Sequence, residues 1–449
     1  MRYAYIIIFF TSCKHFIIIV FKKESRPNHT KAIHMGDTFM KHVGIIAEYN
    51  PFHNGHAYQL QKIKEQFPEK QILVEMSGNY VQRGEPAIYN KYLRAECALA
   101  CGADIVFELP CVFSISSAEY FATAAVLSLN ATGMIDTLCF GAEDEDLNAM
   151  IQIARLLIDE PSDYKSMLKD NLKKGISYPK ARSAAVSSYL NHAEYEALLK
   201  KPNNILGIEY IKTILKYELD ITPVIIKRQG SDYNDTTLSH TMSSASALRS
   251  TIWNSKEISI FSKLKSFMPE VCYEILNDRS EARPLFWSDF YDYLQYALWK
   301  EASSIDRFFE MPIELANRIS SIPNYPSDIL EFFELLYSRN YTNTRIQRAL
   351  LNLLLNNTKE NMEQIKDFGY IRYLRILGFH EKSSILLREM KACCTVPVIS
   401  KVAARNQLSS EHIPFFEKEI CMNTLYYQAY LKKYKEKLPN EYQRSVIII

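Results

Sequence analysis

The sequence predicts an α/β protein, built as a doubly wound, Rossmann-like parallel sheet with a helical insert and followed by an all-helical C-terminal domain. Two observations lead to this prediction. Between residues 43 and 253, short apolar runs alternate with segments of helical spacing, which is the pattern of βαβ units. Beyond residue 254 the apolar residues recur with helical periods, and proline-containing joints at Pro312 and at Pro323 to Pro326 separate the segments.

Each predicted strand is a short apolar run bounded by polar or turn-forming residues. The runs are Val43 to Ala47, Gln71 to Met76, Asp104 to Leu109, Thr137 to Phe140 and Pro223 to Lys227. A longer helical insert, residues 146–217, precedes the last of them. Because open parallel sheets bind ligands at the carboxyl ends of their strands, residues that directly follow these runs are the first candidates for a functional site. Glu48 and Glu108 stand at such ends, and each could equally cap a helix.

The segments of helical spacing beyond residue 254 are Ser288 to Ala302, Ile329 to Ser338, Arg345 to Asn356 and Ile371 to Met390. Two of them carry arginine pairs at a spacing of three, Arg345 with Arg348 and Arg372 with Arg375. Such a face suits a phosphate backbone. It equally suits a helix that keeps its charged side in water, and both interpretations stay open.

Composition places the chain among ordinary globular proteins and limits the electrostatic arguments. The 449 residues are 47% hydrophobic and 23% charged, which favours two domains rather than one. The formal net charge is only +2, so any nucleic-acid site must be a local basic patch. Nine scattered cysteines without a CxxC motif favour a reduced, cytoplasmic setting.

The first 39 residues differ from the rest of the chain. They begin MRYAYIIIFFTSCKHFIIIVFKK, an apolar stretch that Lys14 and His15 interrupt and that lacks a small-residue cleavage site. We expect this apolar leader not to belong to the working protein, with Met40 as the working start. We therefore expect no membrane association.

The most informative motif is His53-Asn54-Gly55-His56, in the segment GIIAEYNPFHNGHAYQ from Gly44 to Gln59. A buried-strand pattern ends at Asn50-Pro51, and helical spacing begins at His56. The motif therefore stands at a helix start, where unpaired backbone N–H groups and the helix dipole favour anionic phosphate. The two histidines share one face of the turn and add donors, and Gly55 leaves the backbone open to a ligand.

A second motif, far along the chain, strengthens the phosphate interpretation over a zinc site. Zinc ligands on a helix usually stand four residues apart with a third ligand nearby, which this motif lacks. Met242 to Arg249 reads MSSASALR: its serines can cap a helix and donate to phosphate oxygens, and Arg249 offers a planar fork of donors. The sequence therefore predicts a nucleoside-triphosphate site without a metal site formed by protein ligands.

Several long segments between these motifs resemble one family, the tRNA(Met) cytidine acetate ligases of the HxGH (HIGH-type) nucleotidyltransferase superfamily. They are Met76 to Pro110, Phe140 to Glu143, Pro202 to Gly207, Lys227-Arg228 and the serine–arginine segment, and the resemblance runs from about Met40 to the C-terminus. Two positions depart from the family pattern. Asn90 stands where the family often has Asp, which puts a charge-dependent role there in doubt, and Ser246 replaces a frequent Thr but keeps the hydroxyl.

The resemblance implies an ATP-dependent ligase. Acetate attacks the α-phosphate of ATP to give acetyl-adenylate and pyrophosphate, and the acetyl group passes to N4 of the wobble cytidine of elongator tRNA(Met), forming N4-acetylcytidine. Mg²⁺ is expected with the triphosphate. In this interpretation residues 40–253 form the ATP-binding catalytic domain and residues 254–449 a helical domain that binds tRNA. Oligomeric state is not predicted.

The resemblance also assigns residues. His53 and His56 stabilise charge on the α-phosphate, and Ser246 with Arg249 bind the departing pyrophosphate. The nucleotide is held by the segment of the first motif and by three later residues: Ile46, Ala47, Glu48, Tyr49, Asn50, Pro51, Phe52, His53, Asn54, Gly55, His56, Ala57, Tyr58, Gln59, Gly141, Asn203 and Arg228. Such chemistry needs positioning and charge stabilisation more than a protein nucleophile.

Two alternative functions and the role of one basic group remain open from the sequence. The chain could be an adenylyltransferase for a small cofactor precursor, although such enzymes are usually single compact domains, or a non-catalytic RNA-binding protein, which the intact histidines and Arg249 argue against. Separately, the basic residues Arg83, Lys91 and Arg94 either meet the ATP tail or tRNA, or form a solvated helix face.

Overall fold

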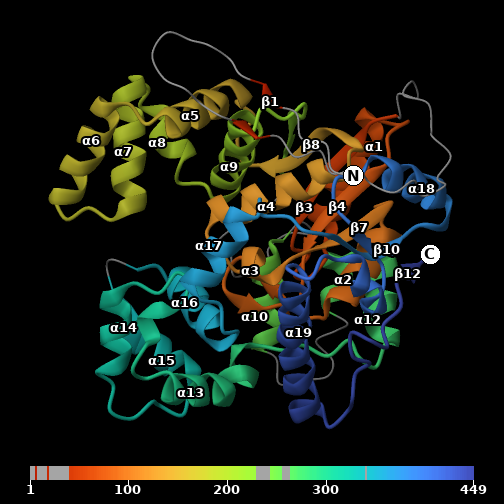
Figure 1. Cartoon of the computed structure of the whole chain (residues 1–449). Helices are drawn as coiled ribbons and strands as arrows, with labels where there is room; N and C mark the ends of the chain where they lie inside the picture. Colours follow the sequence, from red (N-terminus) through yellow and green to blue (C-terminus); the bar gives the residue numbers. More distant parts are fainter. Residues whose placement is uncertain (1–5, 8–17, 20–39, 229–242, 255–262, 339–340) are drawn as a thin grey trace. The chain divides into compact units, whose positions relative to one another are not determined.

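The computed structural model describes residues 6–7, 18–19, 40–228, 243–254, 263–338 and 341–449 (Figure 1). It divides into two compact units, residues 1–39 and 40–449. In the first unit β1 (Ile6–Ile7) pairs antiparallel with β2 (Ile18–Ile19), while Lys14 and His15 lie outside the described residues. Among the described residues, none of the helices has the length and apolar character needed to span a bilayer.

The second unit is built around a parallel sheet whose strands are those that the sequence predicts. In sheet order they are β7 (Ile105–Leu109), β4 (Ile72–Ser77), β3 (His42–Ala47), β8 (Ile135–Ala142) and β9 (Thr222–Lys227). Each predicted strand is confirmed within two residues at either end. The chain runs outward from β3 to β7 and then returns to the other side of β3. This reversal between β3 and β8 is the topological switch point at which such sheets bind ligands.

The C-terminal region is mainly helical, but the prediction that it is all-helical is wrong in three short segments. β10 (Leu374–Phe379) joins the sheet antiparallel to β7, and β11 (Val398–Ile399) and β12 (Ile447–Ile448) pair with β10. The first half of the predicted helix Ile371 to Met390 is therefore a strand, followed by α18 (Ser384–Cys393). Without β10, the outer edge of β7 would have backbone N–H and C=O groups without hydrogen-bond partners. The apolar segment of β10 satisfies these groups by pairing with β7.

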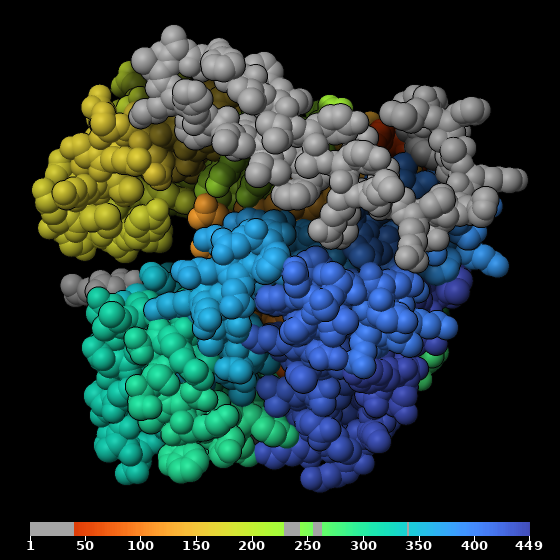
Figure 2. Space-filling model, viewed as in Figure 1, coloured from red at the N-terminus to blue at the C-terminus, as the bar shows by residue number. Residues whose placement is uncertain are grey.

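Helices cover the sheet and form the insert (Figure 1). Around the sheet lie α1 (Asn54–Gln66), α2 (Lys91–Ala100), the short α3 (Cys111–Ser114), α4 (Ala118–Ala131), α10 (Ala245–Trp253) and α12 (Glu270–Asp278). The insert comprises α5 (Leu147–Asp159), α6 (Ser162–Lys173), α7 (Tyr178–Leu190), α8 (Glu194–Leu198) and α9 (Pro202–Lys216). Because α9 packs on both α4 and α5, the insert is anchored beside the end of β8. α6 and α7 project away from the sheet (Figure 1), and they belong to the yellow lobe of Figure 2.

The remaining helices share a core with the N-terminal half. They are α13 (Tyr291–Lys300), α14 (Ile313–Ser320), α15 (Ile329–Leu336), α16 (Asn343–Leu354), α17 (Lys359–Asp367) and α19 (Ile413–Tyr434). One hydrophobic cluster joins the apolar faces of α13, α14, α15, α16 and α19 to Tyr80, Cys111 and Ile115. Residues 40–449 therefore pack as one compact unit, and the domain boundary near residue 254 stays a prediction.

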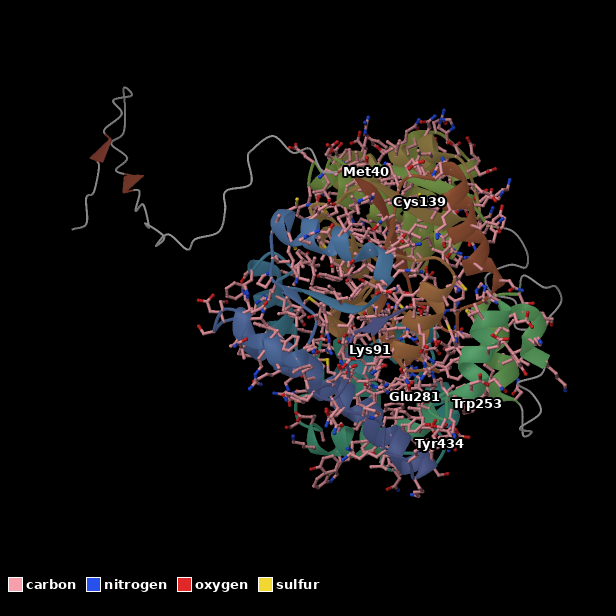
Figure 3. The ribbon with its side chains drawn as sticks, turned by 90° about the vertical axis from the view of Figure 1, so that its right-hand side faces the viewer. Met40, Lys91, Cys139, Trp253, Glu281 and Tyr434 are labelled. Carbon is pink, nitrogen blue, oxygen red and sulfur yellow. The ribbon has the colours of Figure 1, made fainter. Side chains whose placement is uncertain are left out.

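A buried group of four charges ties the C-terminal segment to the sheet. Lys91, whose side chain is completely buried, contacts Glu108 at 2.7 Å and Glu441 at 3.0 Å, and Figure 3 shows it within the ribbon. Arg375 on β10 pairs with the same two carboxylates. Burial alone would raise the pKa of Glu441, but Lys91 and Arg375 outweigh it and hold that pKa below its ordinary value.

This arrangement corrects the sequence interpretation of two residues. Lys91 and Arg94 are 0% and 1% exposed, so neither lies on a solvated helix face or in the position of a tRNA-contacting patch. Arg375 is likewise no part of an arginine face on a helix, because it lies in β10 and is buried against Glu108 and Glu441.

We predict that Lys91→Met destabilises the fold by about 3–5 kcal/mol, because it leaves two buried carboxylates with one cation. The measurement is the free energy of unfolding in urea. The control is Lys62→Met, which removes a lysine from an exposed pair with Glu65 on α1 and should leave stability unchanged. A loss for Lys91→Met no larger than that of the control would contradict the prediction.

Candidate nucleotide-binding site

A cleft opens at the carboxyl ends of β3 and β8, at the switch point of the sheet. It encloses about 920 Å³ of empty space, counting the part open to solvent. Its walls contain most of the residues predicted to bind nucleotide: Ile46, Ala47, Glu48, Tyr49, Asn50, His53, His56, Gln59, Gly141, Asn203, Arg228, Ser246 and Arg249. Segments up to 200 residues apart in sequence therefore meet at one place.

The start of α1 is capped by the two histidines of the motif. His53 is the N-cap, and its Nδ1 accepts from the backbone N–H of Gly55 at 3.0 Å. His56 reciprocates, because its Nδ1 accepts from the backbone N–H of His53 at 3.3 Å. The rings stack with centroids 3.8 Å apart. This is the geometry of a capping box, with imidazoles in place of the usual hydroxyl and carboxylate.

The capping bonds determine the protonation state of both rings. An Nδ1 that accepts a hydrogen bond carries no proton, so the neutral ring holds its proton on Nε2. Burial, together with the charges of Arg228 and Arg249, lowers the pKa of His53 to about 3. Burial, His53 and Arg228 lower the pKa of His56 well below its ordinary value. Both rings are therefore neutral near pH 7 and present an Nε2–H donor.

The serine–arginine segment forms the opposite wall. Ser244 caps α10 by accepting from the backbone N–H of Ala247 at 3.2 Å, which leaves Ser246 and Arg249 on the wall of the cleft. Arg249 donates from Nη1 to the carbonyl of Asn50 at 2.8 Å, and its Nε lies 3.0 Å from Glu85. These contacts hold the guanidinium beside the first motif. Met242 at the start of the segment lies outside the described residues.

The end of β8 forms the remaining wall. A Cβ on Gly141 would lie 3.4 Å from Cγ of Arg228, so the glycine keeps this strand end open under the arginine. Asn203 at the start of α9 is tied to the same place, because its Nδ2 donates to Glu143 at 2.6 Å. Two segments quoted for the family resemblance, Phe140 to Glu143 and Pro202 to Gly207, are thus hydrogen-bonded to each other.

Some predicted residues do not line the cleft. Phe52 is buried in the core, and the side chain of Asn54 donates to the carbonyl of Ser266. Pro51 and Ala57 also lie off its walls, while Gly55 and Tyr58 line a smaller adjoining cavity with His53 and His56. Glu108, left open by the sequence, belongs to the buried charge group rather than to the cleft.

Several lining residues were not singled out from the sequence: Gln82, Phe121, Phe140, Leu206, Tyr210 and Ala245. Gln82 stands with Arg83 in the turn between β5 (Tyr80–Val81) and β6 (Glu85–Pro86), and the backbone N–H of Gln82 donates to Glu48 at 2.7 Å. The density of Gly, Asn, Gln and Arg from Ser77 to Pro86 favours an active-site loop, and both Gln82 and Arg83 line the cleft. Burial raises the pKa of Glu48, against the opposing charges of Arg249 and Arg83.

The donors of this cleft are suited to a phosphate chain. The two neutral imidazoles and the guanidinium-bearing residues Arg228 and Arg249 line the same space. Within the described ranges, no group of three or more His, Cys, Asp or Glu side chains is placed to bind a metal ion.

Comparison with known proteins gives the family. The sequence model of the HIGH Nucleotidyl Transferase family matches residues 40–441. A tRNA(Met) cytidine acetate ligase of Acetivibrio thermocellus is 38% identical over 415 residues, which cover 91% of this chain and 100% of that protein. The chain belongs to the tRNA(Met) cytidine acetate ligase family. A ligase of the same name from Clostridium acetobutylicum is 40% identical, over 81% of this chain and 90% of its own length.

Solved structures of this ligase family have the same fold. Apo TmcAL of Thermotoga maritima superposes with a TM-score of 0.85 at 30% identity, covering 91% of this chain and 100% of that chain. The same protein bound with alpha-thio ATP superposes with a TM-score of 0.83 at 29% identity, covering 91% and 99%. A member of the ligase family with this fold thus binds an ATP analogue.

The neutral histidines predict a specific pH dependence of stability. A histidine whose pKa is about 3 in the folded state and about 6.5 in the unfolded state stabilises fully above pH 6.5, and this contribution is lost as the pH falls. His53→Asn keeps a capping side chain but removes the titration. Well below pH 6.5, wild type should therefore lose about 1.4 kcal/mol more per pH unit than His53→Asn.

The measurement is urea unfolding of both proteins between pH 7 and pH 5. Titrating groups other than His56, whose pKa His53 also lowers, are common to the two proteins and cancel in the difference. Parallel stability curves would show that His53 takes up its proton in the folded state as readily as in the unfolded state.

Proposed function

We propose that this chain is an ATP-dependent ligase that activates acetate as acetyl-adenylate and transfers the acetyl group to N4 of the wobble cytidine of elongator tRNA(Met). The observation that carries the proposal is the convergence of the His53–His56 cap, Ser246, Arg249 and Arg228 on one cleft at the switch point. The names of the relatives and the bound ATP analogue of the Thermotoga structure support it.

In the first step an acetate oxygen attacks the α-phosphorus of ATP. A bond forms between that oxygen and phosphorus, the bond to the oxygen bridging the α- and β-phosphates breaks, and pyrophosphate leaves. His53 and His56 donate Nε2–H bonds to the α-phosphate oxygens, on which charge builds up. Because both rings are neutral and buried, these donors are already oriented and cost little reorganisation during the reaction.

The opposite wall binds the leaving group. Arg249 and Ser246 hold the β- and γ-phosphates in this proposal, and the fork of the guanidinium suits phosphate oxygens. Arg228 and the open strand end at Gly141 seat the nucleoside. Asn203, fixed by Glu143, contacts the nucleotide from α9.

In the second step the N4 amine of cytidine attacks the acetyl carbonyl carbon. The bond between that carbon and the phosphate oxygen breaks, AMP leaves and the amine loses a proton. Mg²⁺, which neutralises part of the triphosphate charge, belongs to the proposal as an ion held mainly by phosphate oxygens. The proposal also places the protein in the cytoplasm. The cysteines in the described part of the chain are free thiols, which agrees with that location.

Acetate-dependent exchange of labelled pyrophosphate into ATP tests the first step without tRNA. We expect wild type to exchange only when acetate is present, and His53→Asn or His56→Ala to slow exchange about 10²- to 10³-fold, because each removes one donor to the α-phosphate.

The matched control is His192→Ala, a half-exposed histidine in the insert that pairs with Glu194, and it should exchange at the wild-type rate. Exchange that does not depend on acetate, or unchanged exchange in both site variants, would contradict the proposed roles. Release of labelled N4-acetylcytidine nucleoside from digested tRNA then tests the transfer.

A further inference from the structure

A second cavity lies away from the nucleotide cleft and shares none of its lining residues. It is bounded by α3, by the segment that follows α16, by α17, by the approach to β10 and by α19. It encloses about 450 Å³ of empty space, counting the part open to solvent. We call it the Asn357 cavity, and the argument uses Phe113, Asn357, Tyr370, Arg372 and Phe415 from its walls.

Two side chains of the Asn357 cavity have polar atoms without protein partners. Asn357 is 1% exposed, yet both its Oδ1 and its Nδ2 are buried without a hydrogen bond. Arg372, 5% exposed, donates from Nη2 to the carbonyls of Gln364 and Ile365, but its Nη1 is also buried without a partner. Buried polar atoms in native proteins are nearly always hydrogen-bonded, and here one acceptor and two donors of cavity-lining residues have no partner in the protein.

The same cavity has flat aromatic walls. The Arg372 guanidinium is held between Phe368 and Phe415, 4.6 Å and 4.0 Å from the ring centroids. Phe113 stacks on Tyr370 with centroids 5.7 Å apart and an interplanar angle of 30°. Tyr370 has φ +69, a left-handed conformation that non-glycine residues rarely adopt and that is enriched at binding sites.

We propose that the Asn357 cavity binds one unstacked pyrimidine base of the tRNA. Proteins read single-stranded RNA by stacking splayed-out bases on aromatic or arginine planes and by hydrogen-bonding their Watson–Crick edges. The Asn357 amide supplies an adjacent acceptor and donor, and Arg372 Nη1 supplies a second donor. This set matches cytosine through N4, N3 and O2, or uracil through N3, O4 and O2 with the amide turned over.

A guanine edge, with one acceptor and two donors, lacks this complementarity. The cavity is smaller than the nucleotide cleft, which favours one ring over a nucleoside triphosphate. The inference rests on the proposed function for the identity of the RNA, and it adds a base-recognition site remote from the reacting atoms.

The decisive variant is Asn357→Leu, with affinity for unmodified tRNA(Met) transcript measured by filter binding. Because the Asn357 side chain makes no hydrogen bond within the protein, an apolar residue of similar size should keep or raise Tm. It should weaken tRNA binding about tenfold or more, because two hydrogen bonds to the base edge are lost. Acetate-dependent pyrophosphate exchange should persist, since Asn357 does not line the nucleotide cleft.

The matched control is Asn352→Leu on α16. Asn352 is equally buried but donates to the carbonyl of Arg348 at 2.9 Å and does not line the cavity, so tRNA affinity should stay at the wild-type value. Unchanged affinity in a folded Asn357→Leu protein would overturn the proposal and leave the cavity as a water site.

Photo-crosslinking of the wild-type protein keeps the proposal testable if Asn357→Leu does not fold. tRNA transcripts carrying 5-iodocytidine or 5-iodouridine should crosslink to peptides containing Phe113, Tyr370 or Phe415, and crosslinks only to other peptides would overturn it. Failure of the proposed function is distinguishable, because it would appear as absent acetate-dependent exchange in the wild type, whereas both tests of the cavity measure binding alone.

Discussion

The structure around the nucleotide cleft depends on one buried cation, Arg94. Its guanidinium is 1% exposed and donates to backbone carbonyls: to Tyr89 at 3.0 Å, to Glu48 at 2.5 Å, to Ser77 at 3.1 Å and to Gly78. Burial lowers the pKa of this guanidinium to about 10, so the group is still charged near pH 7. A buried cation without its hydrogen bonds would be very costly, and the loops must therefore keep their carbonyls turned toward it.

The hydrogen bonds of Arg94 link the carboxyl ends of two neighbouring strands, β3 and β4. Glu48 follows β3 and leads into the His53 motif, while Ser77 ends β4 and Gly78 leads on toward the Gln82 turn. Gly84 in that turn has φ +80, and a Cβ there would lie 2.4 Å from the backbone nitrogen of Arg348 on α16. The C-terminal helix α16 therefore packs directly against this turn. The buried charges of Lys91, Glu108, Arg375 and Glu441 hold the C-terminal strands against the sheet.

The cleft itself combines permanent positive charge with neutral donors. Arg228 and Arg249 are charged whether or not ATP is bound, and they oppose protonation of His53. Neutral histidines can share the small space at the helix start, where two imidazolium groups stacked at 3.8 Å would repel each other strongly. The site therefore attracts a polyanion through its arginines and the helix dipole, while the imidazoles provide directional hydrogen bonds to it.

Much of the sheet and the first motif could be predicted, because the information is local. Apolar runs mark β3, β4, β7, β8 and β9, and a helix start after Asn50-Pro51 places His53 and His56. The predictions failed where residues distant in the sequence determine the local structure. Arg372 and Arg375 have the spacing expected for one face of a helix. Arg375 instead lies in a strand, because β7 pairs with that strand and Glu441 neutralises the charge of Arg375.

The same limit applies to the site. Lys91 and Arg94 looked like surface charges because their partners, Glu441 and the loop carbonyls, cannot be recognised from neighbouring sequence. Phe121 and Tyr210 reach the cleft from α4 and α9 only because these helices pack together. The Asn357 cavity joins α3, α17 and α19 in a comparable way, and nothing in the sequence near Asn357 marks it.

The most direct measurement follows the oxygen atoms of acetate. If the acetate carboxylate attacks the α-phosphorus in this cleft, a reaction with [¹⁸O₂]acetate, ATP and tRNA must leave one ¹⁸O atom in the phosphate of the AMP released, detected by mass spectrometry. The pyrophosphate should carry none. Unlabelled AMP, or ¹⁸O in pyrophosphate or inorganic phosphate, would contradict attack at the α-phosphate and with it the roles given to His53, His56 and Arg249.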